Sequence, residues 1–326
     1  MLIIPRRKFL RVAGGAVALP FASRMARALD YPTRPVRIVV GFPGGSTSDA
    51  IARIVGQRLS EKLGQPFIVE DRPGASGNIA TEEVVNAPAD GYTLLLLGSN
   101  HAINETLFKD LSFSFSRDIA PIASIMSTPG VMEVNPSVPA KTVPEFIAYA
   151  RANPGKINLG SSGNGSLIHM YGVLFVLMTG LNIVDVAYRG SPPAVADLLA
   201  GQLQIMFDNV PTSLGYINSG RLRPLAVTTK MRVEALPDLP PLSDFLPGYD
   251  GSLWQGLGAP RNTPAAIVDK LNGEVNAAFN DPAFITQIRA LGGLPLQLSP
   301  AAFGKFIADD TAKWGNVIRD ANVTPN

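Results

Sequence analysis

The stretch VRIVVGFPGGSTSDAIAR, residues 36–53, joins a run of β-branched residues to the start of an apolar-periodic segment. Val36–Phe42 is predicted to be a strand. Ser48–Leu63 is predicted to be a helix, because apolar residues recur on one face and Gly64 follows as a stop signal. Between them, Gly44 and Gly45 allow a tight turn. A strand that leads straight into a helix is the unit from which α/β folds are built.

The same alternation continues along the chain and predicts an α/β fold with parallel sheets. Further strands are expected at 67–70, 93–98, 119–127, 131–134, 157–160, 183–188, 203–207, 225–228 and 254–259. Further helices are expected at 77–87, 143–152, 167–179, 192–200, 264–280, 283–290 and 300–321.

Two stretches are expected to cross between lobes. One is the extended region 119–138, which contains Pro129-Gly130 and Pro136, and the other is the proline-dense run 236–254. They divide the chain into a first lobe at 29–123, a second lobe at 124–251 and a return to the first lobe at 252–326. We expect hinges in the 120s and near 250, with a cleft between the lobes where α/β proteins collect their ligands.

The first 28 residues carry the features of an export signal. Arg6-Arg7 precede Lys8-Phe9-Leu10, a modest apolar segment follows, and Ala26-Arg27-Ala28 forms a small-x-small cleavage site. The paired arginines resemble a twin-arginine signal, which is an address and not an anchor. The alternative, a basic amphipathic first helix, conflicts with Gly14, Gly15 and Pro20.

Charge and cysteine content exclude several classes of protein. Six of the 28 Lys and Arg residues and none of the 26 Asp and Glu residues lie in 1–28, so the remaining chain carries 22 basic and 26 acidic groups, a net charge of −4. This balance argues against nucleic acid and anionic membranes as partners. The absence of cysteine excludes disulfides, thiolate nucleophiles and a lipid anchor on cysteine. We expect a protein exported to the periplasm, without a membrane anchor.

A second glycine-rich turn has the same design as the first. In INLGSSGNGSLIHMYG, residues 157–172, a predicted strand ends at Gly160 and a helix follows with His169 in its first turn. Free N–H groups and the dipole at a helix start attract an anion. Neither turn contains Lys or Arg, and neither matches a nucleotide-binding pattern. An ordinary capped helix explains either turn alone, but two such turns favour the two halves of one carboxylate site.

An enzyme is the competing class. GSSGNG, residues 160–165, approaches a nucleophile elbow, but Asn164 stands where the second glycine of that motif belongs. The chain has two histidines, His101 and His169, which disfavours a histidine-rich metal site. A periplasmic enzyme that acts on a carboxylated substrate with carboxylates alone remains an alternative. We expect no catalysis, cofactor or metal.

Several blocks in order resemble the periplasmic solute-binding proteins of tripartite tricarboxylate transporters, the Bug or TctC family. They are YPTRPVRIVVGFPGGSTSDAIAR, VEDRPGASGNIATEEVVNAPADGYTLLLLGS, GKINLGSSGNGSLIHM, VAYRGSPPAVADLLAGQLQIMFDN and LWQGLGAPRNTPAAIVDKLN. The resemblance covers essentially the whole chain after the leader. One departure is that residues 44–46 are Gly-Gly-Ser where the family pattern is Ala-Gly-Gly.

The resemblance implies a two-lobe Venus-flytrap fold of the type II kind, which closes on a small organic acid and delivers it to membrane permease subunits. It implies that one carboxylate lies between the two turns, partly through ordered water. The ligand-binding positions carried over are Phe42, Ser46, Thr47 and Asp49 in the first turn, Ser161, Ser162, Gly163, Ser166 and His169 in the second, and Asn100, Asp208 and Asn209 at other strand ends.

The sequence is compatible with two roles each for Asp49 and Arg189. Asp49 is either a first-turn acid on the helix dipole or a cleft residue that orients water or meets a ligand hydroxyl or ammonium. Arg189 either clamps a distal carboxylate or packs its stem beside Tyr188. Dicarboxylates are favoured as ligands, with amino acids, tricarboxylates and aromatic acids open. The protein is expected to be a monomer, and a sensor of the same fold that docks to a signalling receptor is a further alternative.

Overall fold

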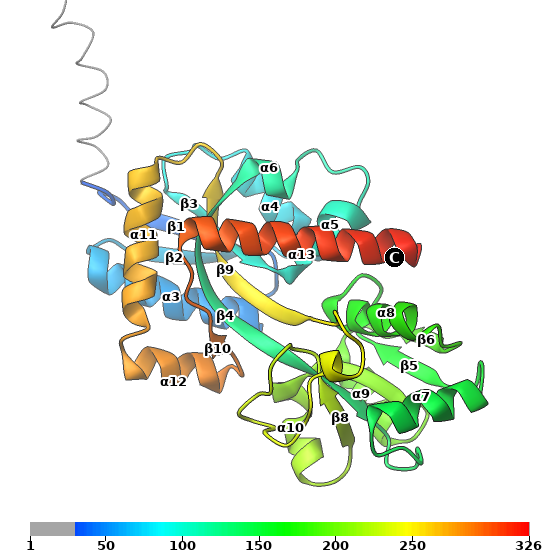
Figure 1. Ribbon diagram of the computed structural model, residues 1–326. Helices are drawn as coiled ribbons and strands as arrows, with labels where there is room; N and C mark the ends of the chain where they lie inside the picture. The colour runs from blue at the N-terminus through cyan, green and yellow to red at the C-terminus, as the bar shows by residue number, and fades with distance from the viewer. Residues whose placement is uncertain (1–29, 326) are drawn as a thin grey trace, which may run out of the picture.

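The computed structural model describes residues 30–325 and folds them into two lobes joined by long strands (Figure 1). The predicted export signal at 1–28 lies outside the described residues. The strand order is β2-β1-β3-β9-β4-β7-β5-β6, with β8 and β10 pairing with β4. The strands are β1 Val36–Val40, β2 Phe67–Asp71, β3 Thr93–Gly98, β4 Ile119–Val134, β5 Asn158–Ser161, β6 Val184–Ala187, β7 Ile205–Asn209, β8 Arg223–Val227, β9 Ser252–Pro260 and β10 Leu294–Pro295.

Helices cover the sheets of both lobes, and α13 runs across from the first lobe towards α8 of the second (Figure 1). The first lobe holds α3 Thr47–Leu63, the short turn η1 Ala75–Gly77, α4 Asn78–Val85, α5 Ser99–Leu107, α6 Phe115–Asp118, α11 Ala265–Ala278, α12 Pro282–Ala290 and α13 Pro300–Asp320. The second holds α7 Val143–Ala152, α8 Leu167–Thr179, α9 Ser191–Leu199, α10 Val210–Asn218 and the short turn η2 Leu242–Asp244.

β4 is one continuous strand, so the predicted break near residue 129 is wrong. Residues 119–129 of β4 pair with β9 in the first lobe, and residues 130–134 pair with β7 in the second. Pro129 and Gly130 therefore lie where the strand changes partner, a place where proline's missing N–H leaves no gap within a ladder.

The sheets are mixed, and the expectation of parallel sheets holds only in part. β1 runs parallel to β2 and β3, and β5 runs parallel to β6 and β7. β4 and β9 run antiparallel to their neighbours. Both are crossing strands that enter a sheet from the other lobe, so the helix crossover that makes neighbouring strands parallel does not apply to them.

Three helices were not predicted: α5, α10 and the four-residue α6. The sequence of α5, SNHAINETL, is rich in asparagine and serine, which have weak helix propensity. In α10, VPTSLGYIN, a proline and a glycine interrupt the periodic pattern, and the proline lies in the first turn, where its missing N–H is harmless. α5 packs chiefly against α13, and α10 packs against β4 and β7, which are contacts that the local sequence does not encode.

Thr228 ties the two crossing segments together. Its hydroxyl accepts a hydrogen bond from Gly130 N–H at 2.9 Å and donates to the Gly251 carbonyl at 2.6 Å. Its backbone N–H donates to Gly130 O, and Gly251 N–H donates to Thr228 O. A Cβ atom at Gly130 or Gly251 would overlap the ring of Tyr171, so both positions require glycine.

Buried apolar residues join the lobes beside these crossings. Trp314 of α13 packs on Tyr171 of α8 with ring centroids 6.3 Å apart, and Phe207 of β7 continues the cluster. The Tyr249 hydroxyl donates to the Tyr171 carbonyl at 2.9 Å. Strand ends of the two lobes also face each other around a cavity.

Candidate functional site

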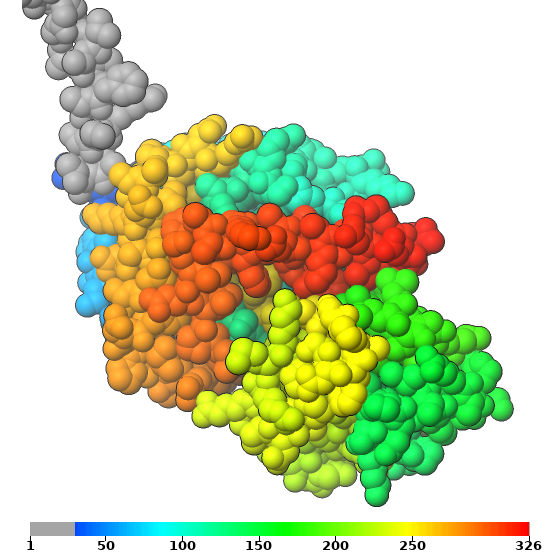
Figure 2. Space-filling model, in the orientation of Figure 1, coloured from blue at the N-terminus to red at the C-terminus, as the bar shows by residue number. Residues whose placement is uncertain are grey.

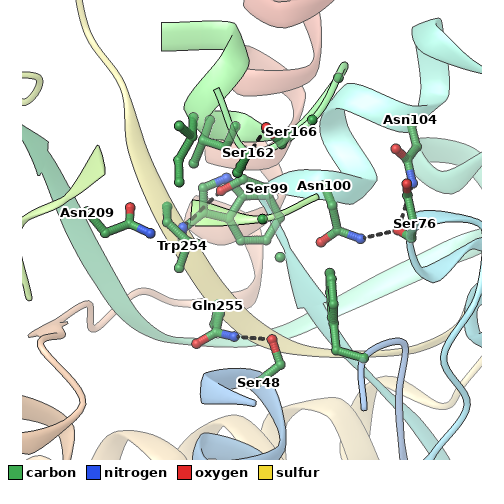
Figure 3. Close-up of a pocket in the computed structure, with 18 of the residues that line it drawn as sticks. Ser48, Ser76, Ser99, Asn100, Asn104, Ser162, Ser166, Asn209, Trp254 and Gln255 are labelled. Atoms are coloured by element: carbon green, nitrogen blue, oxygen red, sulfur yellow. Dashed lines mark hydrogen bonds between the residues drawn. The ribbon is translucent and has the colours of Figure 1, made fainter. Parts of the chain in front are cut away.

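A cavity of about 510 Å³ lies between the lobes and is the site built by the strand ends. Figure 2 shows the two lobes meeting beside α13, and Figure 3 shows the polar side chains that surround the cavity. Its lining residues are Phe42, Ser48, Ser76, Leu96, Leu97, Gly98, Ser99, Asn100, Asn104, Ser162, Gly163, Asn164, Gly165, Ser166, Leu167, Ile168, Tyr188, Arg189, Gly190, Asn209, Leu253, Trp254 and Gln255.

The first glycine turn contributes Phe42 and Ser48 to the cavity wall. Ser48 accepts a hydrogen bond from the Gln255 side chain at 2.8 Å, which fixes the position of both side chains (Figure 3, lower part). Ser46 is the N-cap of α3 and accepts from Asp49 N–H. Of the predicted residues in this turn, Phe42 lines the cavity, whereas Ser46, Thr47 and Asp49 do not.

The second glycine turn contributes Ser162 through Ser166. The Ser162 hydroxyl donates to the Ser166 hydroxyl at 2.9 Å, and both side chains lie together in Figure 3. Ser166 is the N-cap of α8. Ser162, Gly163 and Ser166 therefore line the cavity as predicted positions, while Ser161 and His169 lie outside its lining.

Amide side chains of α5 build the wall of the first lobe. Asn100 and Asn104 both donate to the carbonyl of Ser76, at 2.8 and 3.0 Å (Figure 3). Ser76 has a left-handed φ of 56°, and its neighbour Ala75 has a φ of 46°. Such backbone is unfavourable for residues other than glycine. Two amides on one carbonyl hold the turn in this conformation beside the cavity.

The remaining wall of the second lobe carries the positive charge. Among the described residues that line the cavity, Arg189 is the one with a charged side chain, and it has no ion pair within residues 30–325. Its neighbour Tyr188 donates its hydroxyl to Asp197 at 2.6 Å; this hydrogen bond, together with burial, raises the pKa of Tyr188 to about 12. Tyr188 therefore stays neutral, and its hydroxyl is engaged away from the ligand.

Asp208 lies behind the wall, and Asn209 lies in it. The fully buried Asp208 carboxylate accepts hydrogen bonds from Asn209 N–H at 2.7 Å and from the Ser191 hydroxyl at 3.1 Å. Burial raises the pKa of Asp208 to about 6. The bond from Ser191 joins the start of α9 to the end of β7, next to the cavity-lining residues Gly190 and Asn209.

Several lining residues carried no signal in the sequence, namely Ser76, Asn104, Trp254 and Gln255. Asn104 lies one helical turn after Asn100, on the same face of α5. A prediction of α5 as a helix would therefore have identified Asn104 as a neighbour of Asn100 at the cavity. Trp254 and Gln255 lie on the crossing strand β9, and they reach the cavity only through the pairing of β9 with β3 and β4.

No group of three or more His, Cys, Asp or Glu side chains within residues 30–325 is arranged to hold a metal ion. No helix in that range is both long and apolar enough to cross a membrane.

Two α/β lobes around a cavity of neutral polar and apolar side chains, with a single charged group among the described lining residues, are typical of solute-binding receptors. The model of the tripartite tricarboxylate transporter family receptor matches residues 51–323, and the chain belongs to this family. The predicted resemblance is thereby confirmed. The family consists of substrate-binding proteins and not of enzymes, so the chain is a receptor.

Relatives match over nearly their whole length. BugT of Bordetella pertussis is 33% identical over 316 residues, which cover 96% of this chain and 97% of BugT. A Rhodopseudomonas palustris protein solved with adipate is 37% identical, with a TM-score of 0.77, 91% of this chain covered and 100% of that chain. MatC of the same organism, solved with malate, is 29% identical, with a TM-score of 0.73 and coverages of 88% and 100%. These structures confirm the two-lobe fold.

Proposed function

We propose that this protein is a periplasmic receptor that binds a small organic acid, preferentially a dicarboxylate, and delivers it to the permease subunits of a tripartite transporter. The observation that carries the proposal is the donor set of the cavity. Neutral hydroxyl and amide groups from both lobes surround it, and Arg189 is the single charged group among the described lining residues. The export signal predicted at 1–28 directs the receptor to the periplasm.

Neutral donors are sufficient for one carboxylate. Hydrogen bonds to a charged group contribute roughly 1.5–3 kcal/mol each, and micromolar affinity corresponds to about 8 kcal/mol. Ser166 from the second lobe and Ser48 from the first keep their hydroxyl protons for the ligand, at opposite sides of the cavity, because both oxygens accept in the hydrogen bonds that they make within the protein. A ligand that contacts both sets stabilises the state in which the lobes are close together.

The second carboxylate is assigned to Arg189, whose guanidinium offers forked donors. Apolar residues between the polar groups, such as Leu97, Ile168 and Leu253, suit the methylene chain that joins two carboxylates. The solved relatives with adipate and malate support this ligand class.

The test is a ligand screen on the chain without its leader. Thermal unfolding is measured with malate, adipate, citrate, glutamate and benzoate, and calorimetry follows for every acid that raises the melting temperature. We expect malate or adipate, the dicarboxylates without an amino group, to give the largest rise. A flat response across all five acids, or a larger rise with benzoate, citrate or glutamate than with malate or adipate, would overturn the proposal.

The predicted contact residues are tested separately. Ser162→Ala removes the cavity-lining hydroxyl that donates to Ser166 and so directs the Ser166 proton towards the ligand, and Ser137→Ala serves as a control because Ser137 lies on a loop of the same lobe away from the cavity. Ser162→Ala is expected to weaken dicarboxylate binding with little change in stability. Equal affinity in the two variants would contradict the assignment of Ser162.

A further inference from the structure

Each of the two glycine turns contains a hydrogen bond of the same kind, from a glycine N–H to a side chain that does not line the ligand cavity. In the first turn, Gly45 N–H donates to Asp49 Oδ2 at 2.8 Å. In the second, Gly165 N–H donates to His169 Nδ1 at 3.1 Å. Both glycines are left-handed, with φ of 82° and 72°. Each turn thus places its glycine N–H on a side chain of the helix that follows.

The two acceptors occupy the same helical position. Ser46 caps α3 and accepts from Asp49 N–H at 3.2 Å, and Ser166 caps α8 and accepts from His169 N–H at 3.2 Å. Asp49 and His169 are therefore each the third residue of their helix, and each holds the glycine that precedes the cap. The arrangement is a capping box displaced by one residue.

Neither acceptor reaches the ligand cavity. Asp49 is 5% exposed, and its other oxygen pairs with Arg53 Nε at 2.6 Å. His169 is 7% exposed and faces a second cavity of about 440 Å³ on the other side of the turn, where its Nε2 lies 3.4 Å from Asp185 Oδ2. Because Nδ1 accepts from Gly165, the proton of the neutral ring is on Nε2, towards Asp185.

We propose that Asp49 and His169 are a matched pair of positioning residues, one in each lobe, which fix the glycine turns so that the cavity-facing groups are set before the ligand arrives. The proposal rests on the carboxylate-binding function above. Glycine adopts both positive and negative φ values. Without these hydrogen bonds the turns would become ordered only when the ligand binds, and the lost conformational entropy would lower the affinity. A carboxylate and an imidazole can serve alike here, because each needs only one acceptor lone pair.

The hydrogen bonds within the two turns determine which of their groups are free to contact the ligand. The Gly45 and Gly165 amides are occupied and do not donate to the ligand, and Asp49 is not available to an ammonium group. Asp49 therefore gives no preference for amino acids over dicarboxylates of equal length.

Substitutions at both positions test the pair. Asp49→Ala and His169→Ala remove the acceptor, and each is expected to raise the Kd for the best dicarboxylate about tenfold. Asp49→Asn and His169→Asn retain an oxygen at the δ position, and each is expected to recover most of the lost affinity. Amide hydrogen exchange at Gly45 and Gly165 in the ligand-free protein should be faster in the alanine variants and slow again in the asparagine variants.

Glu145 provides the matched control, because α7 begins with the same arrangement. Lys141 N–H donates to Glu145 Oε2 at 2.8 Å, and the N-cap Thr142 accepts from Glu145 N–H at 3.3 Å. No residue of α7 lines the ligand cavity. Glu145→Ala is expected to lower stability through the lost cap and to leave the Kd unchanged.

The outcomes separate the two proposals. Wild-type affinity in the alanine variants, or asparagine variants as weak as the alanine ones, would overturn the positioning role, and the second result together with a changed ligand preference would indicate direct contact. If the wild-type protein binds no carboxylate, the proposed function fails, and the exchange rates of Gly45 and Gly165 still decide whether the side chains hold the turns.

Discussion

Gly165 of the second lobe lies directly against Leu107 at the end of α5 in the first lobe. A Cβ atom built on Gly165 would overlap Leu107 Cδ2. The turn that carries Ser162 and Ser166 therefore meets the opposite lobe at a residue without a side chain. The spacing of the lobes at this end of the cavity is set by backbone against a buried leucine.

Gly165→Ala is expected to hold the lobes apart and to raise the Kd for a dicarboxylate by more than about tenfold, since contacts that need both lobes are lost. The double variant with Leu107→Ala removes the overlap and should regain part of the affinity. Calorimetry gives the Kd, and small-angle scattering with ligand should show a larger radius of gyration for Gly165→Ala than for the wild type.

The backbone strain of this substitution needs its own control. Gly180 caps α8 with a φ of 62°, and a Cβ atom added there would meet no other atom within 4 Å. Gly180→Ala therefore carries the strain of a left-handed alanine, about 1–2 kcal/mol, without an overlap. Equal affinities of the Gly165→Ala and Gly180→Ala proteins would show that the contact with Leu107 does not govern closure.

Arg189→Gln is expected to reduce binding of adipate more than binding of hexanoate, which has the same chain with one carboxylate. The lost charge-assisted hydrogen bonds correspond to about 1.5–3 kcal/mol, or roughly a tenfold to hundredfold rise in Kd for adipate. Arg151→Gln on α7, away from the cavity, changes the net charge equally and should bind as the wild type does. Parallel losses for both acids would contradict the assignment.

The fold could be predicted well where one element carries its own signals. α3 begins within one residue of its predicted start, because Ser46 is a cap, apolar residues repeat on one face and Gly64 ends the helix. The sequence predicts a division of β4 at Pro129-Gly130 because proline and glycine usually interrupt strands. It does not show that the strand changes partner there, since that depends on the meeting of two sheets.

The candidate site was predictable to a similar extent. The glycine turns are recognisable as strand-to-helix junctions with hydroxyl side chains, and Ser162, Gly163 and Ser166 do line the cavity. The direction of Asp49 and His169 was not predictable, because it depends on which side of the turn the glycine N–H faces. Gln255 could not be found, because it reaches Ser48 only across the tertiary structure.

Thr228→Val is expected to lower the free energy of unfolding by about 1–3 kcal/mol, because it leaves the buried Gly130 N–H and Gly251 carbonyl without a side-chain partner. Thr229→Val is the neighbouring control, since the Thr229 hydroxyl donates only to the nearby Met231 carbonyl. Urea denaturation measures both. Similar losses in the two proteins would show that the Thr228 hydroxyl does not stabilise the crossing.

A buried acid in the second lobe gives the protein a pH dependence. Glu133 of β4 is fully buried; its Oε1 accepts from the Ser213 hydroxyl at 2.7 Å, and its Oε2 has no hydrogen-bond partner among the described residues. Burial raises the pKa of Glu133 to about 8, with a smaller contribution from the nearby Asp208 carboxylate. The folded protein therefore keeps a proton on Glu133 at pH values where the unfolded chain has released it.

The contribution of Glu133 to stability should consequently fall as the pH rises from the ordinary glutamate value of 4.5 to about 8, since this group binds more protons in the folded state than in the unfolded state. Asp208, with a pKa raised to about 6, and the buried His101, with a pKa lowered from 6.5 to about 4, contribute mainly below pH 6.5, so the interval from pH 6.5 to 8 reports on Glu133. Glu133→Gln keeps an acceptor for Ser213 and cannot titrate. Urea denaturation across this interval should show that the free energy of unfolding of Glu133→Gln increases relative to that of the wild type as the pH rises. A constant difference between the two proteins would mean that Glu133 is already ionised in the folded state.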